Sequence, residues 1–127
     1  MIDPVNIAWK YLSSLTDLPQ GSVTGDMVGR QAGDTTIYLA QSGGHRMVRD
    51  RMDRADIEYD VYHQDRAEAS RLARVVRQAL LEQLPGLAVD EALVLDVAEI
   101  SSPRYYPDST SREHMYGGEV SVFYVGP

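Results

Sequence analysis

The clearest pattern in this chain is a strict alternation of apolar and polar residues over residues 55–63. A period of two places the apolar side chains on one face of a β-strand and the polar side chains on the other. The apolar positions are Ala55, Ile57, Tyr59 and Val61, and the carboxylates between them are Asp56, Glu58 and Asp60. The pattern predicts a half-buried strand whose second face is acidic. Its carboxylates repel one another, so they are solvated, which is the commonest arrangement, or paired with the nearby arginines, or placed on a surface that should not hold an anion.

Two other segments have the three- and four-residue spacing of amphipathic helices. The first begins at Asp3 and Pro4, residue types that suit a helix cap and first turn, and it ends before residue 19. The second follows Asp65, and Glu68 stands three residues later, where it can bond back to the cap N–H as in a capping box. Pro85 and the glycine after it end this helix.

Shorter apolar runs predict four more strands, over residues 22–30, 35–41, 93–100 and 119–125. Residues 42–44, Ser-Gly-Gly, are expected to close a hairpin and to open an arginine-rich loop. Prolines and hydroxyl residues predict a second loop over residues 101–112, and a loop of this length usually has a function or is mobile. The elements predict one α+β domain over residues 1–127, with a single antiparallel or mixed sheet flanked by an N-terminal helix and one long amphipathic helix.

Composition limits the classes of partner. The chain has 127 residues, 43% of them hydrophobic, which is ordinary for one globular domain. Its 19 acidic side chains against 12 basic ones give a net charge of -7, which argues against tight binding of nucleic acid. No apolar run approaches the roughly 20 residues that cross a bilayer, and the N-terminus does not have a signal-peptide pattern. We therefore expect a protein made in the cytoplasm, without a membrane partner.

Positive charge is concentrated in one segment of this acidic chain. Its charged residues are Arg46, Arg49, Asp50, Arg51, Asp53 and Arg54. The planar guanidinium suits paired carboxylates at subunit contacts, although general use of Arg in a GC-rich genome would produce the same bias. Mixed charge at such close spacing fits a protein partner better than nucleic acid, so we predict a subunit interface here.

Patterns of catalysis and metal binding are missing from the sequence. The chain has no cysteine, and His45, His63 and His114 are not spaced as zinc ligands. Ser42 is not preceded by the glycine that a nucleophile elbow requires. Glycines recur every fourth residue over residues 21–33, but no Gly-Lys-Ser/Thr phosphate loop follows. We expect no enzymatic activity, no metal and no cofactor.

Several segments together resemble a known family. They are Ser42-Gly43-Gly44-His45-Arg46, Arg49-Asp50-Arg51, Asp60-Val61-Tyr62, Ser102-Pro103-Arg104-Tyr105-Tyr106-Pro107-Asp108 and the closing run over residues 119–126. With the order of elements, they resemble the tail terminator proteins of long-tailed, siphovirus-type bacteriophages, particularly those that infect actinobacteria. The resemblance implies a virion protein that forms a hexameric ring on the head-proximal end of the tail tube, stops tube polymerisation and docks the neck of the filled head.

The implied partners are further copies of the chain, the tail tube protein, a neck or head–tail connector protein, and genomic DNA that passes through the ring without specific binding. In such a ring the arginine segment would pair across a head-to-tail contact. Asp56, Glu58 and Asp60 would line the channel. A loop with Arg104, Tyr105, Tyr106, Asp108 and Arg112 would reach the tube or the neck.

Three alternatives stay open at the level of sequence. Another neck component, such as a head-completion or stopper protein, is the closest, since it would share size, acidity and ring formation. A ligand-binding or hydrolytic domain would need a pocket of converging polar groups. A module for single-stranded nucleic acid would use the arginines with stacking by Tyr105 and Tyr106, and would bind in a salt-dependent way.

Overall fold

The computed structural model describes residues 3–48, 52–108 and 113–126. It has helices α1 (Pro4–Ser13) and α2 (Arg66–Gln78), with a π-helical turn η1 (Ala79–Gln83) after α2. The strands are β1 (Val23–Thr24), β2 (Thr36–Val48), β3 (Met52–His63), β4 (Ala88–Val89), β5 (Ala92–Asp108) and β6 (Glu113–Val125). The predicted α+β class is confirmed.

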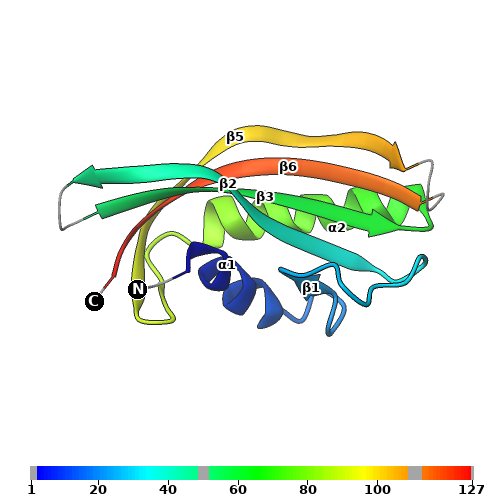
Figure 1. Cartoon of the computed structure of the whole chain (residues 1–127), viewed down its shortest axis with the longest axis horizontal. Coiled ribbons are helices and arrows are strands. Elements are labelled where there is room, and N and C mark those ends of the chain that lie inside the picture. Colours follow the sequence, from blue (N-terminus) through cyan, green and yellow to red (C-terminus); the bar gives the residue numbers. More distant parts are fainter. Residues whose placement is uncertain (1–2, 49–51, 109–112, 127) are drawn as a thin grey trace.

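The strands form one mixed sheet in the order β1-β2-β3-β6-β5-β4. β1 runs parallel to β2, and every other neighbouring pair is antiparallel. Two long hairpins, β2–β3 and β5–β6, are joined where β3 pairs with β6. Figure 1 shows that the turning ends of these hairpins lie at opposite ends of the sheet.

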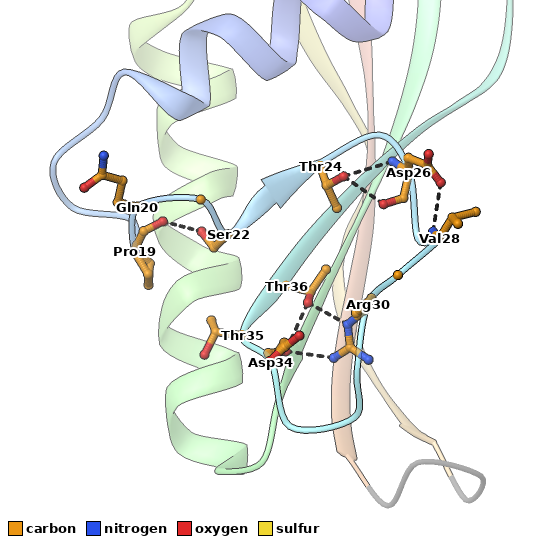
Figure 2. Close-up of a pocket in the computed structure, with 12 residues that line it drawn as sticks. Pro19, Gln20, Ser22, Thr24, Asp26, Val28, Arg30, Asp34, Thr35 and Thr36 are labelled. Atoms are coloured by element: carbon orange, nitrogen blue, oxygen red, sulfur yellow. Dashed lines mark hydrogen bonds between the residues drawn. The ribbon is translucent and has the colours of Figure 1, made fainter.

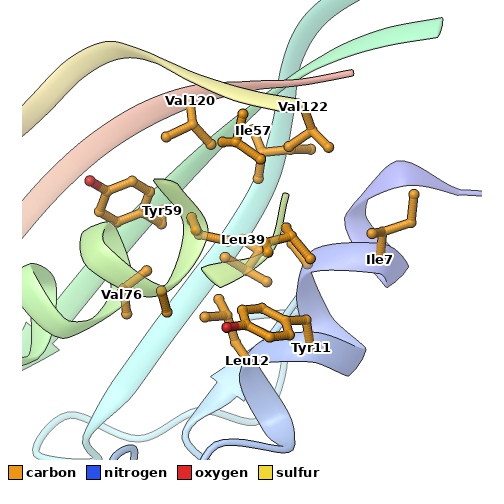
Figure 3. Close-up of a cluster of buried hydrophobic side chains, with 14 of the residues drawn as sticks. Ile7, Tyr11, Leu12, Leu39, Ile57, Tyr59, Val76, Val120 and Val122 are labelled. Carbon is orange, nitrogen blue, oxygen red and sulfur yellow. The ribbon is translucent and has the colours of Figure 1, made fainter. Parts of the chain in front are cut away.

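Both helices pack on the same face of the sheet (Figure 1), where they cover the apolar core. Figure 3 shows the convergence of buried side chains from α1 (Ile7, Tyr11, Leu12), from α2 (Val76) and from the strands (Leu39, Ile57, Tyr59, Val120, Val122). The alternation predicted for residues 55–63 is confirmed, since its four apolar residues are all in this core. No helix of the described residues lies on the opposite face of the sheet, which we call the open face (Figure 1).

The two predicted helices are confirmed, with side-chain caps at their N-termini. The Asp3 carboxylate accepts a hydrogen bond from the Val5 N–H at 3.0 Å, and the Asp65 carboxylate accepts one from the Ala67 N–H at 3.2 Å. The predicted capping box is only half formed. The Asp65 N–H donates to the His63 ring (Nδ1) at 2.9 Å.

The predicted strand over residues 22–30 is wrong beyond Val23–Thr24, and β1 pairs with β2 in parallel. Backbone N–H groups of this segment donate to nearby side chains instead of to a neighbouring strand. Thr24 Oγ1 accepts from the Asp26 N–H at 3.0 Å, and Asp26 Oδ1 accepts from the Val28 N–H at 2.8 Å. Such local bonds compete with sheet pairing. The segment over residues 25–35 is therefore a loop, which we call the β1–β2 loop.

Residues 42–44 do not close a hairpin, as the sequence predicted, but lie inside β2. The register with β3 shifts between Gln41 and Gly43, which marks a β-bulge. Gly44 has φ +136°, and a Cβ on it would lie 2.8 Å from the Ala55 Cα. Glycine is therefore needed here to bring β2 close to β3. In the sequence, glycines of this kind cannot be told from those of a turn.

The predicted loop over residues 101–112 is wrong for residues 101–108, which belong to β5, while residues 109–112 lie outside the described part of the chain. The register with β6 shifts between Ser101 and Arg104, so Ser102 and Pro103 form a bulge. Proline has no N–H to donate and is tolerated at bulges and on sheet edges. β4 pairs with only the first two residues of β5, so the rest of β5 is an edge of the described sheet.

Candidate functional site

The open face of the sheet gathers the carboxylates that the sequence pattern predicted on one side of β3. In the β3–β6 pairing, Asp56 is opposite Ser121, Glu58 is opposite Glu119, and Asp60 is opposite Gly117. Residues directly opposite each other in a sheet share a face. The carboxylates of the open face around the centre of the β3–β6 pairing are Asp56, Glu58, Asp60 and Glu119, and we call this group the acidic face.

Two members of the acidic face, Asp56 and Glu119, accept hydrogen bonds from neighbouring side chains. Asp56 Oδ1 accepts from Arg54 Nε at 2.9 Å and from Ser121 Oγ at 2.7 Å. Burial works to raise the pKa of Asp56, but the hydrogen bonds from Arg54 and Ser121 outweigh it, and the pKa is lowered. Glu119 accepts a hydrogen bond from Ser42 Oγ, which links β6 to the bulge of β2.

Asp60 is the exception on this face, because it is buried, with 9% of its surface exposed. The expectation of a solvated carboxylate is wrong at this position. Burial raises the pKa of Asp60 to about 7, and the negative charge of Glu58 and a hydrogen bond with it act in the same direction. Asp60 Oδ1 has no hydrogen-bond partner among the described residues. Asp60 thus keeps its proton at mildly acidic pH.

Two adjacent glycines of β6 make room for this arrangement, and the sequence analysis missed both. A Cβ on Gly117 would lie 2.6 Å from Asp60 Oδ1 on the open face. A Cβ on Gly118 would lie 2.5 Å from the Tyr59 ring (Cζ), on the core side. A glycine pair within a run of strand-forming residues is the signal that could have indicated close approach of a neighbouring strand.

The described residues of the arginine segment lie on strands where the sequence predicted a loop, with Arg46 on β2 and with Asp53 and Arg54 on β3. Arg46 is opposite Asp53, and their side chains approach to 4.0 Å (Nε to Oδ1) at an exposed site. Arg54 pairs with Asp56 across 2.9 Å. Arg49, Asp50 and Arg51 lie outside the described residues.

The residues predicted to contact the tube or the neck are divided between the two faces of β5. Arg104 and Tyr106 are on the open face, where Arg104 Nη2 donates to Tyr106 Oη at 2.5 Å. Tyr105 is on the helix side, with the Arg66 guanidinium 3.9 Å from its ring centre and its hydroxyl 2.8 Å from His114 Nδ1. Asp108 is the last residue of β5, and Arg112 lies outside the described residues.

A buried ion pair that the sequence did not predict ties the β1–β2 loop to β6. The Arg30 side chain is 12% exposed and that of Glu113 is 1% exposed. Arg30 Nη1 donates to Glu113 Oε1 at 3.0 Å. Figure 2 shows that Arg30 also donates to Thr36 Oγ1, at 2.6 Å, and to the Asp34 carbonyl oxygen, at 2.8 Å. The loop is therefore held in one shape.

The hollows of the described surface are open to solvent. One of about 500 Å³ lies beside the β1–β2 loop (Figure 2), and the donors of Arg30, which lines it, are already engaged. No three acidic or histidine side chains among the described residues are placed to hold a metal ion. No helix in the described part of the chain has the length and apolarity to cross a bilayer.

Comparison with known proteins identifies a shared fold. No known protein family and no curated protein matches the sequence. A solved structure does match, and it is that of a "Virion of native gene transfer agent (GTA) particle". The fold resembles that of a virion chain. The TM-score is 0.75 at 12% sequence identity, and the likeness covers 94% of this chain and 92% of the other, so it is a likeness of fold.

Proposed function

We propose that this protein is a structural virion protein, a tail terminator that forms a hexameric ring on the head-proximal end of a phage tail tube. The observation that carries the proposal is the fold shared with a chain of the GTA virion, which extends over 94% of this protein. The tail-terminator-like segments of the sequence support the finer assignment. In this role the protein stops tube polymerisation and docks the head or neck. Its function is in virion assembly and not in catalysis.

The acidic face supports a ring with the open side of the sheet turned inward. DNA is a dense line of negative charge. A lumen lined by Asp56, Glu58 and Glu119 would repel phosphates weakly along its length, so DNA would pass without adhering, while Asp60, which is buried, would not face the lumen. The helices, on the other face, would then lie toward the outside of the ring.

The two hairpins support contacts in several directions. The β2–β3 hairpin carries Arg46, Asp53 and Arg54 to one end of the sheet, where they would meet a neighbouring subunit in the ring. The β5–β6 hairpin carries Arg104 and Tyr106 toward the other end, where they would meet the tube protein or the neck protein. The protein would be assembled in the host cytoplasm and reside in the virion, at the head-proximal end of the tail.

The test is tail length. The gene is deleted from the genome that encodes it, the intact gene is supplied in trans as a control, and the tails are measured by electron microscopy. We expect overlong tubes without heads. Tails of normal length that fail to join heads would instead assign the protein to an adjacent head-completion or stopper ring.

A further inference from the structure

A hollow of about 300 Å³ lies between α2 and β5, on the helix side of the sheet. The bulge of β5 forms one wall and α2 forms the other. The residues that line the hollow are Ser70, Arg74, Arg77, Ser102, Pro103 and Tyr116. We call it the arginine socket.

The socket carries positive charge that the described residues do not neutralise. Arg77 is paired with Glu99, with Nη2 2.9 Å from Oε2. Arg74 is exposed and has no carboxylate partner in the described parts of the chain. Arg66, at one side, is hydrogen-bonded to the Tyr116 hydroxyl at 3.3 Å, and this bond lowers the pKa of Tyr116. The Arg74 guanidinium therefore lines a hollow without a counter-charge among the described residues, in a protein of net charge -7, and the Ser70 hydroxyl beside it is bonded to Tyr116.

We propose that the arginine socket receives a carboxylate of a second copy of this chain, namely Asp26 of the β1–β2 loop. The inference rests on the proposed ring, and it adds a lateral contact that the arginine segment does not provide. Arginine binds carboxylates through two parallel hydrogen bonds, and the Ser102 hydroxyl, which also lines the hollow, is a further donor. The hollow has room for one side-chain carboxylate, and the acidic chain disfavours a nucleic-acid strand as the occupant.

The register of the sheet places the socket and the loop at matching heights on opposite edges. Tyr38 of β2 is level with Asp60, Asp60 with Gly117, and Gly117 with Arg104, which follows the bulge of β5. Thr24 of β1 pairs with Tyr38 at the other edge. Two copies placed side by side, head to tail, would bring the β1 edge of one against the β5 edge of the next without a shift along the strands. Such a contact is heterologous and can close into a ring.

Asp26 is presented by a loop that is already ordered. Asp26 Oδ1 accepts from the Val28 N–H, and the Asp26 backbone is bonded to Thr24 Oγ1 (Figure 2). Asp26 Oδ2 has no partner among the described residues, so it is available to a neighbour. Val28, beside it, is 88% exposed and would add apolar contact. Binding would cost little ordering of the loop, since Arg30 holds it in place.

A charge-swap experiment tests the contact. One full-length variant carries Arg74→Glu and the other carries Asp26→Arg, and self-association is measured by sedimentation velocity over a concentration series. Each variant alone opposes like charges, so we expect its dissociation constant to rise at least about tenfold. In an equimolar mixture every socket can meet a loop of opposite charge, and we expect association within about threefold of the unmodified protein. The proposal would be overturned if either variant alone associated as tightly as the unmodified protein. It would also be overturned if the mixture associated no more tightly than each variant alone.

Cross-linking decides the question if the purified chain stays monomeric. The chain has no cysteine, so an Asp26→Cys chain and an Arg74→Cys chain can be joined selectively by a short bifunctional reagent. The control replaces Arg74→Cys by Arg71→Cys, on α2 but paired with Glu68 outside the socket. We expect at least about tenfold more heterodimer from the first pair; equal yields would overturn the proposal.

Two further outcomes separate this inference from the proposed function. Overlong tails after gene deletion, together with socket variants that assemble normally, would reject the socket contact and leave the terminator role standing. An Arg74→Glu variant that loses DNA binding instead of self-association would assign the socket to phosphate and reject the contact between copies.

Discussion

The Asp60 carboxyl lies in a place that disfavours its charge. It is covered on the open face, one of its oxygens has no partner among the described residues, and Glu58 stands beside it on the same strand face. Desolvation and a neighbouring negative charge both favour the neutral acid. A protonated Asp60 can donate to Glu58, so the folded chain favours the protonated form of Asp60.

The raised pKa of Asp60 predicts that the free energy of unfolding falls as the pH rises. Because the pKa of Asp60 is raised from 3.8 to about 7, the folded chain keeps a proton that the unfolded chain releases between these values. The contribution to the free energy of unfolding is complete below the lower value and is lost as the pH rises through the upper one. The loss is at most about 4 kcal/mol, since one pKa unit corresponds to about 1.4 kcal/mol. Urea denaturation at a series of pH values would measure it.

Asp60→Asn is the matching variant, because it keeps the shape and removes the proton. We expect its free energy of unfolding to change less between pH 4 and pH 7.5 than that of the unmodified chain. Carboxylates with lowered pKa values, such as Asp56 and Glu99, act in the opposite direction and at more acidic pH. Parallel pH profiles for the two proteins would contradict the assignment of the proton to Asp60.

Position 118 requires a residue without a side chain, because the Tyr59 ring lies directly beside it. An alanine there would press a methyl group against the fully buried Tyr59 ring, so we expect Gly118→Ala to lower the free energy of unfolding by about 1–3 kcal/mol. Gly25→Ala is the control, since its new Cβ would meet the Val5 side chain at an ordinary 3.5 Å. Denaturation of both variants would compare them. Equal stabilities would mean that Tyr59 moves aside at no cost.

At the scale of elements, the β1–β2 loop shows how a single ion pair orders an irregular segment. Residues 25–35 pair with no strand, yet Arg30 joins them to Thr36 at the start of β2 and to Glu113 at the start of β6. Glu113 is almost fully buried, so its charge depends on this partner. Breaking a buried pair by removing one member leaves an uncompensated charge, which costs more than the pair contributes.

We therefore expect Arg30→Leu to lower the free energy of unfolding by about 3–5 kcal/mol. Arg71→Leu removes the exposed partner of Glu68 and should cost no more than about 1 kcal/mol. Adding Glu113→Leu to Arg30→Leu should recover part of the loss, because no charge is then left buried. Thermal and chemical unfolding of the three variants would measure these differences. A loss for Arg30→Leu no larger than for Arg71→Leu would show that the pair does not hold the loop.

At the scale of the whole molecule, one sheet separates two unlike surfaces. The helices and the arginine socket are on one side, and the acidic face is on the other. The β1 and β5 edges lie at opposite ends of the strand order, apart from the short β4. This division suits a subunit that meets its neighbours laterally while it presents one face to a lumen.

The acidic face makes a prediction about DNA. Glu58→Lys with Glu119→Lys reverses the charge of a cross-strand pair on the open face, and we expect this variant to retain DNA at low salt where the unmodified chain does not. Glu82→Lys with Glu91→Lys makes the same change in net charge away from that face. Gel-shift titrations at several salt concentrations would compare the two. Equal retention by both variants would show that total charge matters and the open face does not.

Sequence patterns were sufficient for the elements whose signals are local. α1, α2 and β3 follow from periodicity and caps, and the acidity of one face of β3 follows from its alternation, because each depends only on residues a few positions apart. Two of the strand errors, at residues 42–44 and 101–108, have one cause. Glycine, serine and proline favour turns and bulges alike, and only the partner strand decides between them.

The packing of the folded chain determines what each charged group can do. The pairing of Arg30 with Glu113 joins residues 83 positions apart. The burial of Asp60 depends on Gly117 of another strand, and the socket at Arg74 depends on a bulge in β5. Contacts of this kind arise when segments distant in the sequence are packed together. They cannot be predicted from composition or from spacing along the chain. Burial and electrostatic partners are properties of the packed chain, whereas periodicity is a property of the order of its residues.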